Sequence, residues 1–204
     1  MECLKKNTYD QFYNEHIYVF SLLGIENILK KHNFEIFHVQ NLEIHGGSNR
    51  YFIKKKINKG QIFSSVNKQR KKELNYGIQK ITTYKKFAKR VKLSKEKLKK
   101  IFLKITSKDK KIIGYGVTAK STTILNYCKI GKRLISYFID TTKDKQNKYT
   151  PGTKIPILKY LGFIEKDVDF VFLGAWNFQE EIFNKEKKFI KRGGKFISHV
   201  PFPK

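Results

Sequence analysis

The amino-acid sequence predicts an α/β protein whose second half holds a mainly parallel β-sheet. From residue 111 onward, short β-branched and aromatic runs alternate with helical segments, which is typical of parallel strands joined by helices. The first run leads into a glycine-rich turn, Gly114-x-Gly116-x-x-Ala119, and then into a helix. These observations favour a Rossmann-like domain over residues 109–204. A smaller domain over residues 1–60 and a helical linker over residues 61–108 are predicted ahead of it.

The smaller domain is predicted to contain one helix and an antiparallel strand pair. Residues 20–32 carry apolar side chains at helical spacing, and Ser21 is placed to cap the first turn. Residues 34–40 and 50–53 have the composition of strands. Gly46 and Gly47 lie between them, so we expect a turn where backbone can approach a ligand.

The linker is predicted to form two or three helices. Apolar residues keep helical spacing from residue 66 to residue 105, and Gly77 is the only interruption. Lysines are dense between residues 85 and 111, and we interpret them as a solvated helical face.

The Rossmann-like domain is predicted from four strands and two helices. The first strand begins at Lys111, and the other three cover residues 134–140, 168–173 and 195–197. The helices cover residues 121–130 and 180–190, and the second is closed by Gly193-Gly194.

The net charge of +27 does not by itself indicate a nucleic-acid-binding protein. Arginine, which makes most bidentate contacts to bases, occurs at only five positions, and the lysines are spread along the chain. Lys, Asn, Ile, Phe and Tyr share A/T-rich codons, so a biased genome explains their abundance. A basic surface would still attract an anionic substrate such as a nucleotide diphosphate.

The sequence also predicts a cytoplasmic protein without a membrane span. No apolar run reaches the roughly 20 residues that cross a bilayer, and the N-terminus lacks the apolar core of a signal peptide. The two cysteines, Cys3 and Cys128, fit a reducing compartment and cannot form a four-ligand zinc site. We therefore predict no metal site.

A candidate catalytic motif lies near the start of the chain. Tyr13-Asn14-Glu15-His16 places a phenol, a carboxylate and an imidazole within four residues. A carboxylate can orient an imidazole and raise its basicity, so Glu15 and His16 can form a proton-transfer pair. The alternative is a solvated turn or helix start.

The glycine-rich turn offers a candidate phosphate site. Gly114 and Gly116 would allow close backbone approach, phosphate would lie on the helix N-terminus, and Asp140 stands where such folds bind ribose. The alternative is a turn that only closes the Rossmann-like layer. A P-loop from Gly114 to Ser121 is disfavoured, because Ala119 replaces the required glycine and the sequence shows no evident Mg²⁺-binding aspartate.

Three further segments are candidates for contact with a ligand. His45-Gly46-Gly47-Ser48 combines an imidazole, bare backbone and a hydroxyl, although an ordinary hairpin loop is the more common explanation of such a segment. Thr150, in a polar turn, and Asn177, after a strand end, fall on the edge where open sheets bind ligands. The alternatives place Trp176 in the core and make Asn177 a helix cap.

Taken together, these segments resemble the C-terminal part of the S-adenosylmethionine-dependent nucleotide-sugar C-methyltransferases. The resemblance covers nearly the whole chain, with eight matching segments in the family's order. They are Tyr13-Asn14-Glu15-His16, Phe20-Ser21-Leu22, His45-Gly46-Gly47-Ser48 with Arg50, Gly114-Tyr115-Gly116 through Lys120, Leu125-Asn126-Tyr127, Tyr149-Thr150-Pro151-Gly152-Thr153, Ala175-Trp176-Asn177 and Gly193-Gly194-Lys195-Phe196.

The resemblance implies a transferase that methylates the carbon next to a keto group on a nucleotide-linked deoxysugar. It implies that His16 is the general base, supported by Glu15 and Tyr13, and that S-adenosylmethionine is the methyl donor. The residues it implies for substrate binding are His45, Gly46, Gly47, Ser48, Arg50, Gly114, Gly116, Lys120, Thr150 and Asn177.

The chain also departs from the family pattern. It lacks the cysteine cluster of the family's zinc domain and the early strand, glycine-rich turn and acid that bind S-adenosylmethionine. Residues 1–60 would then be a remnant of the methyltransferase domain. We expect an enzyme that is incomplete alone, with a separate chain carrying the zinc and methyl-donor domains as a partner. The alternative is a non-catalytic nucleotide-sugar-binding module or a truncated remnant.

Overall fold

The computed structural model describes residues 1–204, except for the side chain of His45. The chain divides into two compact units, each of which is described by itself. The first contains Met1–Thr8 and His16–Lys89, and the second contains Tyr9–Glu15 and Arg90–Lys204. The chain therefore passes between the units three times, once inside a helix.

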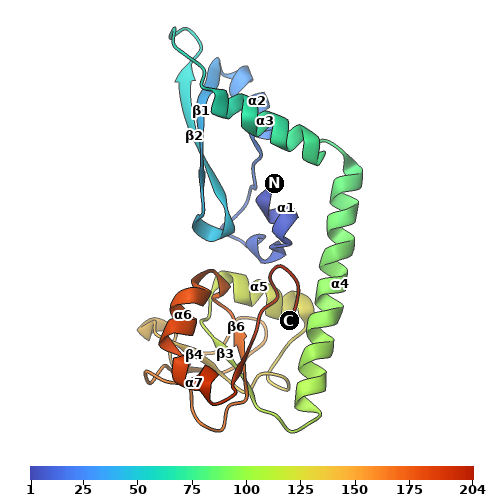
Figure 1. The fold of residues 1–204 in the computed structure, drawn as a ribbon, viewed down its shortest axis with the longest axis vertical. Helices are drawn as coiled ribbons and strands as arrows, with labels where there is room; N and C mark the ends of the chain where they lie inside the picture. Colours follow the sequence, from blue (N-terminus) through green and yellow to red (C-terminus); the bar gives the residue numbers. More distant parts are fainter. The chain divides into compact units, whose positions relative to one another are not determined.

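The first unit is built on an antiparallel strand pair (Figure 1). Its strands pair from Phe34 with Lys55 to Leu42 with Ser48, which confirms the predicted pair. In chain order its elements are α1 (Glu2–Lys6), α2 (Leu22–Lys31), β1 (Phe34–Leu42), the short 3-10 helix η2 (Ile44–Gly46), β2 (Ser48–Lys55), α3 (Ser64–Tyr76) and the first part of α4 (Ile81–Thr106).

Helix α2 is held at its N-terminus from two directions. The Ser21 hydroxyl accepts the N–H of Gly24 at 3.1 Å, as its predicted capping position requires. From α3, the buried Glu73 carboxylate accepts the N–H of Leu22 at 2.9 Å and that of Leu23 at 3.1 Å. These bonds satisfy donors that a helix start leaves without intrahelical partners.

The strand pair has one supported edge and one open edge. Phe63 N–H donates to the carbonyl of Phe37 at 2.9 Å, and Val39 N–H donates to the Ser65 hydroxyl at 3.2 Å. These groups of β1 are thus bonded outside the strand pair. Among the residues that the structure describes, β2 pairs with no strand other than β1.

The second unit is a five-stranded, wholly parallel sheet in the order β5-β4-β3-β6-β7 (Figure 1). From β3, the chain adds β4 and β5 on one side of the sheet and then crosses to add β6 and β7 on the other side. This change of side between β3 and β6 is typical of a Rossmann half-fold. This confirms the predicted α/β, Rossmann-like class. The strands are β3 (Ile112–Tyr115), β4 (Phe138–Asp140), β5 (Ile157–Lys159), β6 (Phe170–Leu173) and β7 (Lys195–Ile197).

Helices and short 3-10 turns complete the second unit. Phe102, on the later part of α4, is fully buried, and its ring lies 5.7 Å from that of Phe172 in β6. The remaining elements are η1 (Tyr9–Gln11), α5 (Ala119–Cys128), η3 (Lys143–Lys145), η4 (Trp176–Phe178), α6 (Gln179–Lys185) and α7 (Lys187–Lys191). None of the described helices is long and apolar enough to cross a membrane.

Two predicted elements differ from the structure, and one strand was not predicted. The single helix predicted over residues 180–190 is two helices, because Glu186 leaves helical geometry and accepts the Tyr160 hydroxyl at 2.5 Å. The strand predicted from residue 134 begins at Phe138, since Leu134 and Ile135 donate to the carbonyl of Gly131 in a turn. Strand β5 was not predicted.

Candidate functional site

The candidate motif spans the point where the chain passes from one unit to the other. Tyr13 and Glu15 belong to the second unit. His16 is the first residue of the segment His16–Lys89, which belongs to the first unit. The Tyr13 and His16 side chains are half-buried, and Glu15 is exposed. Partial burial raises the pKa of the Tyr13 phenol, and the carboxylates of Glu15 and Asp10 raise it further. Tyr13 is therefore a neutral hydrogen-bond donor at physiological pH.

Just ahead of this motif, Asp10 is fully buried among polar groups of the second unit. The Trp176 indole Nε1 donates to Asp10 Oδ2 at 2.5 Å. His199 Nε2 lies 3.3 Å from the same oxygen, and both Asp10 and His199 have no exposed side-chain surface. Trp176 begins η4 just after β6, and His199 lies two residues after β7. All three meet at the carboxyl-end edge of the sheet.

Tyr9 anchors the same segment from the neighbouring side. Its hydroxyl lies 3.3 Å from Ser94 Oγ on α4 and 3.8 Å from Cys128 Sγ on α5. Its ring is edge-on to that of His199, with centroids 6.0 Å apart. Burial raises the pKa of the Tyr9 phenol far above its usual range. Tyr9 and Asp10 together insert the segment into the second unit.

Sequence reasoning did not find this cluster. The sequence predicts no role for Asp10 or His199, and it places Trp176 in a segment at the ligand-binding edge, with the core as the alternative. No local spacing connects residues 10, 176 and 199, because only the sheet topology brings them together.

The structure places the first predicted substrate-binding group on the turn between β1 and β2. Ser48 Oγ donates to the carbonyl of Ile44 at 3.2 Å, and Arg50 Nη1 donates to Gln40 Oε1 at 3.4 Å. The side chain of His45 lies outside what the structure describes.

The two glycines of this turn pack against α1. The carbonyl of Gly46 accepts the Lys6 ammonium at 2.8 Å. Gly47 has φ +119, and a Cβ there would lie 3.0 Å from Glu2 Cγ. Their contact with a substrate stays a prediction.

The glycine-rich turn after β3 uses its own amide groups internally. Gly116 N–H donates to the carbonyl of Ile139 at 2.9 Å, Val117 N–H to Asp140 Oδ2 at 2.7 Å and Thr118 N–H to Ser121 Oγ at 2.9 Å. Asp140 Oδ1 also accepts the N–H of Thr142 at 2.8 Å. The carboxylate that sequence reasoning placed near a ribose therefore closes the turn.

Close packing accounts for the glycines of this turn. A Cβ at Gly114 would lie 2.2 Å from the Phe138 ring, and one at Gly116 would lie 2.8 Å from Ala175 Cβ. Lys120, in the first turn of α5, is buried. The resemblance implies this turn as a substrate site and places S-adenosylmethionine on segments that this sequence lacks. The Gly116, Val117 and Thr118 amides and the Asp140 carboxylate all have partners in the second unit, so in this arrangement they are not available to a phosphate.

Thr150 and Asn177 lie in different settings. Thr150 is buried, accepts the N–H of Ile155 at 2.9 Å and lies 2.7 Å from the Thr153 hydroxyl, so it stabilises its own turn. Asn177 lies in η4, beside Trp176. Its Oδ1 is buried and has no hydrogen-bond partner among the described residues. Asn177 therefore leaves an unpaired acceptor at the carboxyl-end edge of the sheet.

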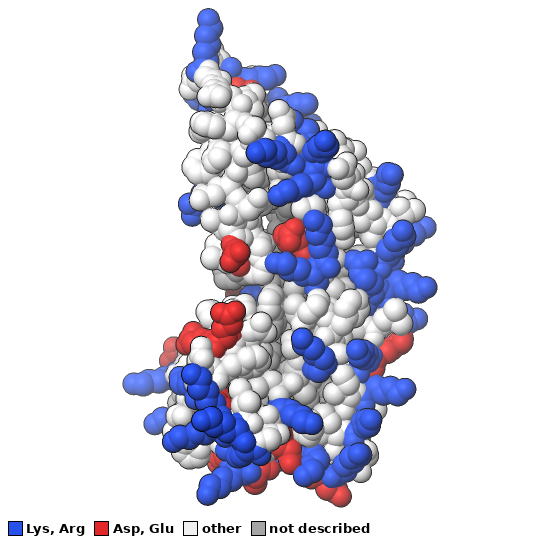
Figure 2. All heavy atoms as spheres, in the orientation of Figure 1, with Lys and Arg blue, Asp and Glu red and all other residues white. Residues whose placement is uncertain are grey.

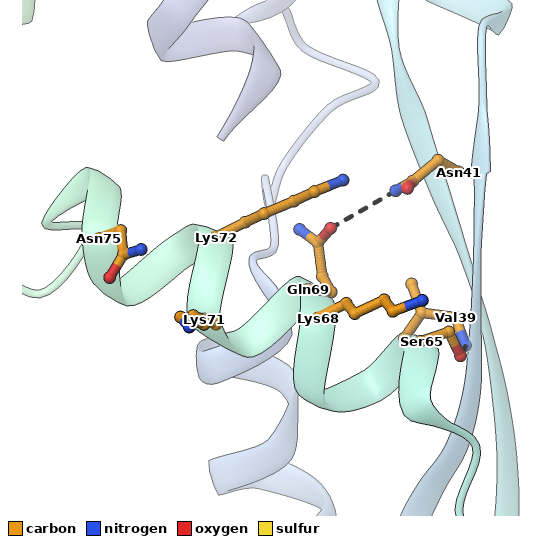
Figure 3. Close-up of a pocket in the computed structure, with 8 residues that line it drawn as sticks. All are labelled: Val39, Asn41, Ser65, Lys68, Gln69, Lys71, Lys72 and Asn75. Carbon is orange, nitrogen blue, oxygen red and sulfur yellow. Dashed lines mark hydrogen bonds between the residues drawn. The ribbon is translucent and has the colours of Figure 1, made fainter.

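A hollow of about 360 Å³ in the first unit was not predicted from the sequence. Figure 3 shows Gln69 bonded to Asn41, with Lys72 extended from α3 toward them. Figure 2 shows many Lys and Arg side chains and few Asp and Glu side chains on the face depicted. The hollow is lined by Val39, Asn41, Ser65, Lys68, Gln69, Lys71, Lys72 and Asn75.

Comparison with known proteins gives two agreeing findings. Residues 43–201 match the family model described as the C-methyltransferase C-terminal domain. All 204 residues align with the C-methyltransferase NovU of Streptomyces niveus at 30% identity and cover 49% of that protein. The chain thus spans about half the length of the curated relative it matches. It belongs to the C-methyltransferase C-terminal domain family.

Proposed function

We propose that this chain is the sugar-handling part of an S-adenosylmethionine-dependent C-methyltransferase that acts on a nucleotide-linked keto-deoxysugar. The observation that carries the proposal is the family match over most of the chain, together with the Tyr13–His16 motif. In the proposed reaction, His16 removes the proton next to the keto group. The enolate carbon would then attack the methyl group of S-adenosylmethionine held outside these residues, so that a C–C bond forms, the S–CH₃ bond breaks and S-adenosylhomocysteine leaves.

The side chains of the motif suit a proton abstraction. A proton next to a ketone is only mildly acidic, so a positioned base and a donor to the enolate oxygen both lower the barrier. Neutral imidazole at His16 would take the proton, and the Glu15 carboxylate would stabilise the resulting imidazolium. Tyr13, whose raised phenol pKa keeps it protonated, would donate a hydrogen bond to the enolate oxygen.

The substrate-binding residues remain those predicted from the resemblance, on the β1–β2 turn and in the second unit, where Asn177 lies at the carboxyl-end edge of the parallel sheet. The positive charge of the chain would attract the diphosphate of a nucleotide sugar. Both cysteines are free thiols, which supports a place for the reaction in the cytoplasm.

We further propose that the donor-binding part pairs with the first unit, either as more of the same protein or as a separate chain. The unpaired edge of β2 supports this, because an open strand edge readily accepts another strand. The relative is about twice as long as this chain, so it has a further part that these residues do not cover.

Exchange of the substrate's α-proton with D₂O tests the base without any methyl donor. The chain is incubated with 4-keto nucleotide-linked deoxysugars in D₂O, and deuterium uptake next to the keto group is followed by NMR. We expect His16→Asn to slow the exchange by about 10²–10⁴-fold, as for loss of a general base. The exposed His32→Asn is the matched control and should keep the wild-type rate.

Equal exchange by wild type and His16→Asn would overturn the role of His16. The same proteins are then mixed with S-adenosylmethionine and a candidate donor-binding chain. Nucleotide-sugar binding without exchange or methyl transfer in any mixture would show a non-catalytic binding module instead.

A further inference from the structure

We propose that Asp10 is a positioning residue that fastens the segment Tyr9–Glu15 to the edge of the parallel sheet and thereby fixes Tyr13 and Glu15 in place. The anchoring follows from contacts inside the second unit. Its consequence for catalysis rests on the proposed function.

The location of Asp10 is the first reason. Open parallel sheets bind ligands at the carboxyl ends of their strands, where the strand order reverses. In this sheet that reversal lies between β3 and β6, and Trp176 follows β6 directly. The Trp176 indole N–H points to the Asp10 carboxylate instead of a ligand. A segment of the chain itself therefore occupies part of this edge.

The second reason is the energetics of burial. A buried carboxylate is costly unless hydrogen bonds or an opposite charge compensate it. Asp10 Oδ2 has both the indole and the His199 imidazole within reach, whereas Asp10 Oδ1 has no hydrogen-bond partner among the described residues. An apolar residue would fill this place more cheaply. Any arrangement that broke the Trp176 bond would leave the buried carboxylate without its hydrogen-bond donor, so this bond favours one arrangement of the segment.

The third reason is the short path from Asp10 to the motif. Tyr9, Asp10 and Gln11 form the buried turn η1, and Glu15 is exposed only four residues later. The Asp10 carboxylate is close enough to Tyr13 to contribute to its raised phenol pKa. The position of Asp10 thus sets where the phenol of Tyr13 and the carboxylate of Glu15 lie.

Trp176 is the single tryptophan of the chain, so its emission reports this contact directly. We expect Asp10→Ala to change the emission spectrum of Trp176 and to raise hydrogen exchange of the amides of residues 9–15 about 10-fold or more, since a buried donor loses its partner. Asp10→Asn keeps an acceptor for the indole and should restore most of both signals. The exposed Asp144→Ala is the control and should match wild type.

The kinetic readout separates positioning from simple stability. In the D₂O exchange assay, Asp10→Ala should lower the rate constant at saturating sugar about 10-fold or more, with nucleotide-sugar affinity within about 2-fold of wild type, because orientation is lost and binding is not. If Asp10→Ala fails to fold, Trp176→Phe, which removes the indole N–H together with one ring of a buried side chain, should change the rate and the affinity in the same directions.

Unchanged emission and unchanged amide exchange in Asp10→Ala would overturn the anchoring. Equal loss of affinity and rate, without rescue by Asp10→Asn, would overturn the positioning role. A wild-type chain that exchanges no substrate proton would refute the proposed function, and the emission and amide exchange would then decide the anchoring alone.

Discussion

Gly116 carries two constraints that can be measured separately. Its φ is +79, a conformation that costs other residues about 1–2 kcal/mol, and a Cβ there would lie 2.8 Å from that of Ala175. Gly193 has φ +91 but nothing within 4 Å of such a Cβ. We expect Gly116→Ala to lower the free energy of unfolding by about 1–3 kcal/mol more than Gly193→Ala, because only Gly116 is also close-packed. Urea denaturation of both variants measures the difference, and equal losses would contradict it.

Glu73, on the lysine-rich helix α3, is predicted to make a large contribution to the free energy of unfolding. Its carboxylate accepts two backbone N–H groups at the start of α2 and the Gln69 amide at 3.0 Å. Glu73→Ala would leave these buried donors without partners, at a cost of about 1–3 kcal/mol.

The neighbouring exposed Lys72→Ala serves as the control and should change the free energy of unfolding by less than about 0.5 kcal/mol. The measurement is chemical denaturation followed by circular dichroism. A loss from Glu73→Ala no larger than that from Lys72→Ala would show that water replaces the carboxylate at the α2 terminus.

At the scale of elements, local signals explain which predictions are confirmed. Ser21 and its apolar stripe predict α2, and Gly77 marks the end of α3, because capping and backbone freedom act within one turn. The strand, glycine-rich turn and helix at β3 are equally local. Strand β5 has only three residues, and the break at Glu186 depends on a distant hydroxyl of Tyr160. Neither the short strand β5 nor the helix break at Glu186 produces a periodic pattern in the sequence.

The residues of the candidate site also divide into those that a local sequence pattern predicts and those that only the fold brings together. The Tyr13–His16 motif is contiguous, so the sequence alone could suggest it. Asp10, Trp176 and His199 are brought together only by the topology of the second unit. The internal pairing of the turn after β3 also depends on Asp140, which is adjacent only in the folded sheet. Tertiary contacts of this kind cannot be derived from spacing.

Asp169 links the starts of two neighbouring strands, and we predict a pH dependence from it. Asp169 Oδ1 accepts the Lys110 ammonium at 2.9 Å and Oδ2 accepts the Lys111 N–H at 3.0 Å. The bond from Lys110, followed by that from the Lys111 amide, lowers the pKa of the Asp169 carboxyl. The contribution to stability is therefore fully present above the unfolded pKa of about 3.9 and is lost as pH falls through the lower, folded value.

The Asp169→Asn variant should lack this part of the acid destabilisation. Its free energy of unfolding should fall less steeply than that of wild type below about pH 4, and the two slopes should agree near neutral pH. Asp144→Asn, at an exposed position, is the control. Parallel acid profiles for Asp169→Asn and wild type would show that the strand ends are held without this carboxylate.

For the whole molecule, the two units differ in how much core they have. The first packs its strand pair around a cluster of four buried residues, Leu22, Ile36, Val39 and Val66, and leaves the edge of β2 open. The second packs twelve buried residues into one cluster beside a five-stranded sheet. A small core and an open edge both lower the free energy of local opening.

We therefore predict that the first unit opens before the second. Native-state hydrogen exchange should show amides of β1 and β2 exchanging faster than those of β3 and β6, because the former pair with a single strand and a small core. A donor-binding chain that extends the strand pair through β2 should slow exchange in β1 and β2 and leave β3 and β6 unchanged. Equal protection of both sheets in the chain alone would mean that the strand pair is already stable. Slowing confined to β3 and β6 on adding the partner would place the docking surface on the second unit.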